Sequence, residues 1–439
     1  MTQAPESRPS EVLGYCLFDF ANSAYTTLIS TVAYSVYFRQ AVAGGAHGDL
    51  LWSLSQVAAH ALLILGAPIL GALADHSGRK RRFLALTAAQ TVVACAALTL
   101  VGPGDVLLGM ALLIVGTLGF EGGYVFYNAC LADVASPRTM GRISGLSWGV
   151  GFLGGLAALL AAAPWIARPL SDGSALDPQA VADYRVSFLV VAAFFAVFAI
   201  PALALLPDRG PHRPITSLAA YARIGFGRVR ETLTQLRRYR DAATFVAAAL
   251  FFYGGIETVI KFSAIYAAVS FGIEGRQLVA LFVVTNLVAA PGTLAAGFVA
   301  DRLGARRTLA WTLVGWVALV LGAALVRSPL GFWVVACGLA VGMGSTQAVA
   351  RSFLAQIAPA QRESEFFGFY VLCSKVGSIA ALLVFGGVSS WTASQRAAVL
   401  AVLPFFVAGL ALLLLVDEGR ARSAALTAPP CLDRPALHI

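Results

Sequence analysis

Long apolar segments alternate with short polar ones along the whole chain. Twelve of the apolar segments reach about 20 residues, the length that an α-helix needs to cross the hydrocarbon core of a bilayer. The charged residues gather between them. This pattern predicts an all-α membrane protein with twelve transmembrane helices. We place the spans at residues 12–38, 50–74, 83–101, 106–133, 142–165, 185–206, 242–269, 277–300, 308–326, 331–355, 366–388 and 395–416.

A short polar motif separates the second span from the third and returns between the eighth and the ninth. Its first copy is the segment GALADHSGRKRR, which begins at Gly71. Five of its positions recur 226 residues later, about half the chain. A hinge repeated at the same place in two apolar halves is typical of a duplicated transporter. The motif residues that we assign to gating are Gly71, Asp75, Gly78, Arg79, Lys80, Asp301, Gly304 and Arg306.

Composition supports the membrane interpretation and fixes an orientation. Of the 439 residues, 59% are hydrophobic and 12% charged, whereas a soluble domain is about a quarter charged. The net charge of +9 lies in the loops, so it indicates membrane orientation rather than nucleic-acid binding. Eighteen basic residues fall on one face and six on the other, which places the first face and both termini in the cytoplasm. We expect a bacterial cytoplasmic (inner) membrane protein, monomeric, without a removable signal peptide.

The spans divide the chain into two bundles. We predict a six-helix bundle over residues 1–206, a cytoplasmic linker over 207–241, a second six-helix bundle over 242–416 and a polar, disordered tail over 417–439. The later part of the linker, 221–240, is either an amphipathic helix on an anionic membrane face or a solvated connection, and we favour the solvated connection.

Several polar side chains lie inside the predicted spans, where an ionisable group costs roughly 2.5–3.5 kcal/mol. Glu257 and Lys261 have the spacing and order of an ion pair within one helix. Adding the repeat offset to Glu121 gives Gln347, so two polar sites occupy equivalent places in the halves. We predict that these groups face a shared aqueous pathway for substrate or protons. Its residues are Asp19, Asn22, Glu121, Tyr124, Asn128, Glu257, Lys261, Gln347, Arg351 and Lys375.

Each of these residues also has a structural interpretation. Glu257 and Lys261 form either a self-neutralising pair or a binding pair. Glu121 is a proton carrier or a hydrogen-bonded packing group. Lys261 and Lys375 are candidates for a charge switch, because lysine releases its proton when desolvated and arginine does not. Arg351 either extends to the membrane interface or serves in gating or anion binding.

The sequence lacks the motifs of an enzyme or a nucleotide-driven pump. The six cysteines are scattered singly, and no group of histidine, cysteine and carboxylate residues has metal-ligand spacing. A phosphate-binding glycine loop is also missing from the sequence. We therefore expect no catalysis, no metal and no cofactor.

The motif at Gly71 resembles the hallmark of the major facilitator superfamily, and a narrower likeness accompanies it. The segment Phe18–Tyr25 resembles the opening signature of the vacuole-effluxer (autophagy-related permease) family. Further matches are Phe126–Ala129 with Asp133, Ser144–Leu146 with Gly151–Gly155, Arg185–Phe188, Gln347 with Arg351–Ser352, and Glu365–Tyr370. One departure lies in span seven, where Tyr253-Gly254-Gly255 replaces a frequent acidic position and Glu257 follows.

The resemblance implies the major facilitator fold, two six-helix bundles around a central cavity lined by spans one, four, seven and ten. It also implies that Asp75 and Asp301 act as a gate latch that stabilises one access state. Fungal members of the family are implicated in releasing amino acids from the vacuole.

These observations predict a secondary active transporter that works by alternating access. The substrate would be a small polar or zwitterionic metabolite. Titratable groups in a dry site predict proton coupling, and the resemblance favours amino acids as substrates and efflux as the direction. Its partners would be the small-molecule substrate, the lipid bilayer and a coupling proton. The alternatives are a multidrug exporter, or a non-transporting membrane scaffold or sensor with the same fold.

Overall fold

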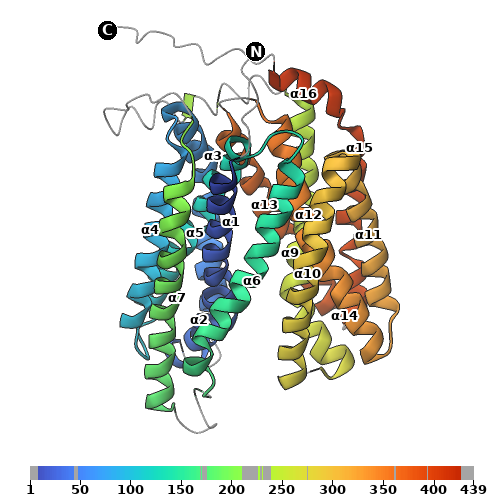
Figure 1. Ribbon diagram of the computed structural model, residues 1–439. Helices are drawn as coiled ribbons and strands as arrows, with labels where there is room; N and C mark the ends of the chain where they lie inside the picture. Colours follow the sequence, from blue (N-terminus) through green and yellow to red (C-terminus); the bar gives the residue numbers. More distant parts are fainter. Residues whose placement is uncertain are drawn as a thin grey trace.

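The computed structural model describes residues 8–43, 48–168, 170, 176–209, 226–227, 230, 239–273, 275–359, 362–392 and 394–426. The described chain is helical, in two bundles that lie side by side (Figure 1). Most of the predicted linker 207–241 and the end of the tail lie outside these residues. The main helices are α1 (Pro9–Ala24), α2 (Tyr34–Tyr37), α3 (Gly48–Ser77), α4 (Lys80–Ala97), α5 (Val106–Val134), α6 (Met140–Ile166), α7 (Pro178–Leu205), α9 (Arg240–Phe271), α10 (Gly275–Leu303), α11 (Ala305–Leu325), α12 (Pro329–Ile357), α13 (Glu363–Thr392), α14 (Gln395–Leu400), α15 (Leu403–Leu415) and α16 (Glu418–Leu426).

The predicted spans agree with this arrangement, and the first of them is irregular. Among the described residues, eleven helical segments are long and apolar enough to cross a membrane. The remaining crossing begins at Pro9 with α1 and continues through a π-helical segment, Tyr25–Val32, to α2. The Thr31 hydroxyl bonds the carbonyl of Thr26, five residues back, which accompanies the wider turn. The all-α membrane fold is therefore confirmed.

Aromatic hydroxyls attach this irregular crossing to its own bundle. Tyr25 pairs with Thr117 of α5 at 3.0 Å, Tyr34 donates to the carbonyl of Gly109 at 2.9 Å, and Tyr37 donates to the carbonyl of Val101 at 2.8 Å. These contacts satisfy polar groups in a region without water, so they stabilise a helix whose own ladder is disturbed.

The hydrophobic cores show where the bundles meet. We call the end of the molecule that carries the two copies of the charged motif the motif end. One continuous core joins both bundles there, from Phe18 and Tyr127 to Phe353 and Phe366. At the opposite end each bundle has its own core, one around Tyr34 and another with the members Tyr266, Ala267, Ile273, Leu281, Ala323 and Phe332. The ribbons of α6 and α10 accordingly converge at the motif end and diverge away from it (Figure 1).

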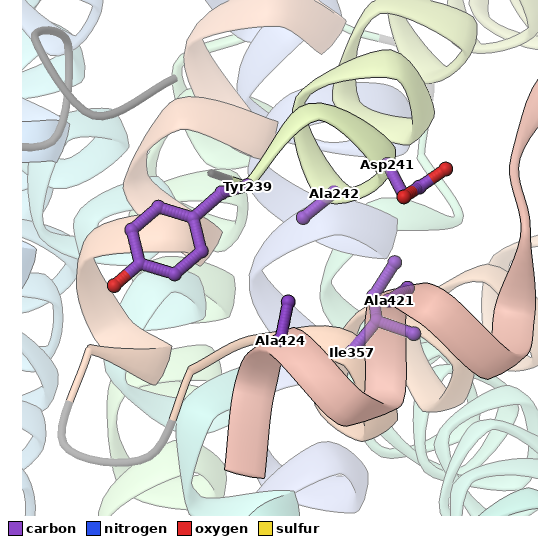
Figure 2. Close-up of a pocket in the computed structure, with 6 residues that line it drawn as sticks. All are labelled: Tyr239, Asp241, Ala242, Ile357, Ala421 and Ala424. Carbon is purple, nitrogen blue, oxygen red and sulfur yellow. The ribbon is translucent and has the colours of Figure 1, made fainter. Parts of the chain in front are cut away.

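The tail is ordered where we predicted disorder. Residues Glu418–Leu426 form α16, so that part of the prediction is wrong. Figure 2 shows α16 beneath the start of α9, with Ala421 and Ala424 beside the small hollow that Ile357 and Ala242 also line. The Arg420 guanidinium donates two hydrogen bonds to Asp241, at 2.6 and 2.7 Å. Small residues toward the bundle and one bidentate ion pair are enough to dock a short polar helix.

Glycine allows the closest contacts between the bundles. A Cβ atom at Gly71 of α3 would collide with the carbonyl oxygen of Ser364 in α13, and one at Gly297 of α10 would lie 2.5 Å from the carbonyl oxygen of Gly141 in α6. The first glycine of each motif copy is therefore a point of backbone contact with the other bundle.

We predict that Gly71→Ala destabilises the contact between α3 and α13 by about 1–3 kcal/mol, the usual cost of overpacking. Gly66→Ala on the same helix is the matched control, because a Cβ there meets no atom within 4 Å. The measurement is the apparent melting temperature of each purified variant in detergent. Equal melting temperatures for the two variants would contradict the prediction.

Candidate functional site

The motif aspartates each cap a helix of the opposite bundle. The carboxylate of Asp75 accepts hydrogen bonds from the backbone N–H groups of Ser364 (3.1 Å) and Glu365 (2.8 Å), in the first turn of α13. Asp301 accepts from Gly141 (2.7 Å) and Arg142 (2.9 Å), in the first turn of α6. The first N–H groups of a helix lack partners and form the positive end of its dipole, so a carboxylate stabilises them.

The basic positions of the two motif copies differ in what they contact. Lys80 bonds Asp133 of its own bundle at 3.3 Å and Glu363 of the other bundle at 3.2 Å. Its counterpart Arg306 donates to the carbonyls of Leu413 and Leu414, at 3.3 and 2.6 Å, and so stays within its bundle. The repeat is therefore symmetric in its aspartates and asymmetric in its cations.

Three further motif residues shape the turn itself. Gly78 and Gly304 have backbone φ angles of 64° and 94°, a region that glycine adopts without strain. These turns reverse the chain between α3 and α4 and between α10 and α11. Arg79 precedes the first residue of α4.

A second contact between the bundles lies deeper, between α1 and α12. An oxygen of Asp19 is 3.6 Å from the Arg351 guanidinium and accepts a hydrogen bond from Ser147 at 2.9 Å. Arg351 also donates to the hydroxyl and the carbonyl of Ser144 in α6, at 2.9 and 2.8 Å. Only 2% of Arg351 is exposed. Its predicted alternative, extension to the membrane interface, is therefore wrong, because its partners lie between the bundles.

Aromatic rings complete the surroundings of this guanidinium. Its central carbon lies 5.4 Å from the ring centroids of Tyr15 and Tyr127 and 5.7 Å from that of Trp148. Ring faces stabilise a desolvated cation, so these rings favour the buried Arg351 guanidinium.

The pair between Asp19 and Arg351 is also costly to break. Removing one partner of a buried ion pair costs about 3–5 kcal/mol, since the other charge is then uncompensated.

A third contact lies about halfway through the molecule. Lys375 of α13 bonds Glu121 of α5 at 2.5 Å, and His60 of α3 is 4.0 Å from the same carboxylate. Glu121 is 13 residues from the end of α5 and Lys375 is 12 residues from the start of α13, so both lie about 18–20 Å from the motif end. The side chains of Glu121 and Lys375 are 17% and 11% exposed.

The remaining residues that we predicted for the pathway lie near these ion pairs but form no ion pair with their members. Among the ion pairs of the described residues, Glu257 and Lys261 do not form the contact that their spacing predicted; both act electrostatically on His60 instead. Lys261 is exposed, and Gln347 is half-buried one turn from Arg351. Tyr124 is three residues from Glu121 on α5, and its ring contacts those of Phe120 and Tyr127. Asn22 and Asn128 are buried beside them.

Sequence reasoning missed the partners that complete these contacts. Ser144 and Asp133 stood in segments that carry the family resemblance, so a signal for them existed. Tyr127, one of the three rings around Arg351, also lies in such a segment. The positions of Ser147, Glu363, Tyr15 and Trp148 gave no such signal, and only folding brings them to the charges.

We predict that Asp301→Ala weakens closure of the motif end, because two hydrogen bonds to a carboxylate contribute roughly 1.5–3 kcal/mol each. A cysteine introduced at Ala348, which is buried at 0% exposure against α6, should then react at least about tenfold faster with a thiol reagent. The background would lack the native cysteines.

Asp105→Ala is the control for this experiment. Asp105 also accepts a backbone hydrogen bond, from Gly102 at 2.9 Å, but within its own bundle. Equal labelling of the two variants would show that Asp301 does not hold the motif end closed.

Known proteins with a similar sequence include transporters and fungal autophagy proteins. The chain is 28% identical over 413 residues to an uncharacterized MFS-type transporter, YxiO, of Bacillus subtilis (strain 168), covering 92% of this chain and 94% of that protein. It is 25% identical over 267 residues to autophagy-related protein 22-1 of Penicillium rubens, covering 56% of this chain and 45% of the fungal protein.

Solved structures with a similar fold include transporters of the major facilitator superfamily. FucP in the outward conformation has a TM-score of 0.68 and 15% identity, covering 93% of this chain and 98% of its own. The human organic anion transporter MFSD10 also has a TM-score of 0.68, with 18% identity and coverage of 92% and 98%. These identities establish the fold alone. A family model described as "Vacuole effluxer Atg22 like" matches residues 50–426, most of the chain, and the protein therefore belongs to this family of major facilitator transporters.

Proposed function

We propose that the protein is a proton-coupled secondary transporter that exports a small zwitterionic metabolite, with amino acids as the leading candidates, across the bacterial cytoplasmic membrane. The observation that carries the proposal is the ion pair between Glu121 and Lys375. It lies between the bundles, about halfway through the molecule, and each bundle supplies one charge.

The two charges of this pair match the two ends of a zwitterion. A ligand ammonium group would bind Glu121 and a ligand carboxylate would bind Lys375, so the ligand replaces each partner with a charge of the same sign. Neither side chain is then left buried and unpaired, which is the costly outcome for ions out of water. A ligand with only one charge would leave Glu121 or Lys375 uncompensated.

The arrangement of the cores supports alternating access. The bundles share one core at the motif end and have separate cores at the other end. If the two bundles rocked about the midplane, the motif end would open and the opposite end would close. The Glu121–Lys375 site would then be accessible from the other side of the membrane. The excess of basic residues at the motif end supports a cytoplasmic position for that end and for both termini.

The names of the relatives support export as the proposed direction of transport. The matching family model is named for an effluxer, and the fungal relatives are named for autophagy. Export from the cytoplasm of a bacterium would correspond to that description. Two charged side chains at the midplane favour a small polar substrate over the varied apolar molecules of a multidrug exporter.

The test is a charge exchange between the two bundles. We predict that Glu121→Lys and Lys375→Glu each reduce exchange of radiolabelled amino acids in proteoliposomes by about a hundredfold or more, because each places two like charges together. The double variant restores an opposite pair and should recover a measurable part of the activity.

The control exchanges the surface pair Glu418 and Arg422, which are 2.6 Å apart in α16 and partly exposed. Such a pair contributes little, so transport should be unchanged. Single variants with full activity, or a double variant as inactive as a single one, would argue against the midplane site. Absence of transport for the whole amino-acid set by the unaltered protein would favour a scaffold or sensor.

A further inference from the structure

An apolar groove lies between α1 and α6, near the motif end. Both helices begin at that end, and their ribbons diverge toward it (Figure 1). Between them is a hollow of about 300 Å³. Its outer edge is open, because Leu13 is 54% and Leu146 37% exposed. The residues that line it are Pro9, Val12, Leu13, Cys16, Leu17, Leu146 and Val150.

Glycines of α6 close the inner end of this groove. A Cβ atom at Gly154 would collide with the carbonyl oxygen of Phe20, and one at Gly151 would lie 3.1 Å from the Ser23 hydroxyl. Nearer the motif end, Leu146 and Val150 of α6 face the groove instead. An unfilled space between such side chains loses van der Waals contacts, so a flexible apolar chain from the bilayer gains by filling it.

The length of the groove favours one kind of occupant. From Pro9 to Leu17 it follows α1 for about 12 Å, at the helical rise of 1.5 Å per residue. A transmembrane helix of another protein would need an apolar surface about 30 Å long. A segment of one acyl chain fits the shorter length.

Two arginines lie at the motif end of the groove, at the same depth. The contact between Phe20 and Gly154 fixes the register of the two helices. Arg8 is 12 residues before Phe20 and Arg142 is 12 residues before Gly154, so both lie about 18 Å from that contact. Both arginines are exposed. Arg142 is also one turn before Leu146, on the helix face that lines the groove.

The acids near these arginines are occupied by other groups. Glu11 is 6% exposed and pairs with Arg209 at 2.5 Å. The carboxylate of Asp301 accepts from the backbone N–H groups of Gly141 and Arg142, at 2.7 and 2.9 Å. Between described residues, neither the Arg8 nor the Arg142 guanidinium takes part in an ion pair. The mouth of the groove therefore has an excess of positive charge.

This charge lies at the level of the lipid headgroups. The 27 residues of α6 span about 40 Å, which is longer than the hydrocarbon core of about 30 Å. The first turn of α6, with Arg142, therefore reaches beyond the acyl chains. Basic residues beside a space between transmembrane helices are typical of sites for anionic lipid headgroups.

We propose that an anionic phospholipid binds here, with one acyl chain in the groove and its phosphate on Arg8 and Arg142. A zwitterionic phospholipid binds less well, because its own cation offsets the phosphate charge. Every group of the site belongs to the first bundle, so the lipid stays bound when the bundles move. The inference needs only a membrane-spanning chain, and it is independent of the proposed substrate and coupling ion.

The test measures lipid binding to the purified full-length protein in detergent micelles. We titrate it with radiolabelled phosphatidylglycerol and with phosphatidylcholine of the same acyl chains. Phosphatidylglycerol should bind about twentyfold more tightly, since each basic residue contributes about fivefold near an anionic headgroup. Changing Arg8→Gln and Arg142→Gln together should remove this preference. Leu146→Trp, which fills the groove, should weaken the binding of both lipids at least about tenfold.

The matched controls lie on α4. Arg82 and Leu86 are the third and seventh residues of that helix and are exposed, as Arg142 and Leu146 are the third and seventh of α6. Arg82→Gln and Leu86→Trp should leave binding within about twofold of the unaltered protein. Equal affinity for the two lipids, or equal effects of the α4 and α6 variants, would overturn the proposal. Displacement of the lipid by soluble glycerol phosphate would also overturn it, because the site would then bind the anion without its acyl chains.

Discussion

Charges buried between two helical bundles in a membrane are stable only when each has a partner, and in this protein the partners come from opposite bundles. Asp19 pairs with Arg351, Glu121 with Lys375, and Lys80 with Glu363. The aspartates of the motif copies add two carboxylates that cap helices across the same interface. Closure of the motif end therefore depends on satisfying polar groups that hydrocarbon would leave unsatisfied.

The same requirement restricts how the bundles can separate. Losing one partner of a buried pair costs about 3–5 kcal/mol, so each contact must be replaced as it breaks. At the motif end, water would solvate the aspartates once the helices they cap had moved apart. The deeper pairs need a ligand, a proton or internal water. Because the charges are placed at three depths, the proposed opening would replace the contacts one after another, and the depth of each pair would decide what replaces it.

Close packing of the backbone gives the interface its geometry. Gly71 and Gly297 let α3 and α6 approach α13 and α10 closely enough for short carboxylates to reach the first turn of the facing helix. The hydrogen bonds of Asp75 and Asp301 and the glycines four residues before them are thus one structural unit. The 226-residue repeat preserves this unit in both halves, while Lys80 and Arg306 have diverged in their contacts.

Much of the fold followed from the sequence because membrane helices obey a simple constraint. Each span must be long and apolar, so the alternation of apolar and polar segments located the crossings, and the positions that recur after 226 residues located the repeated motif. The irregular first crossing did not follow, because π turns depend on local competition for hydrogen bonds. The order in α16 did not follow either, because a nine-residue polar helix is stable only through docking, here through Arg420 and Asp241.

The sequence by itself determined which charges the membrane must accommodate: Asp19, Glu121, Arg351 and Lys375 were identifiable from their cost in hydrocarbon. It did not determine how they pair. Spacing along one helix favoured Glu257 with Lys261, yet Lys375 bonds Glu121 from 254 positions away. Only the tertiary structure decides such pairs, because two charges form an ion pair only when folding places their helices side by side with both side chains on the contacting surfaces.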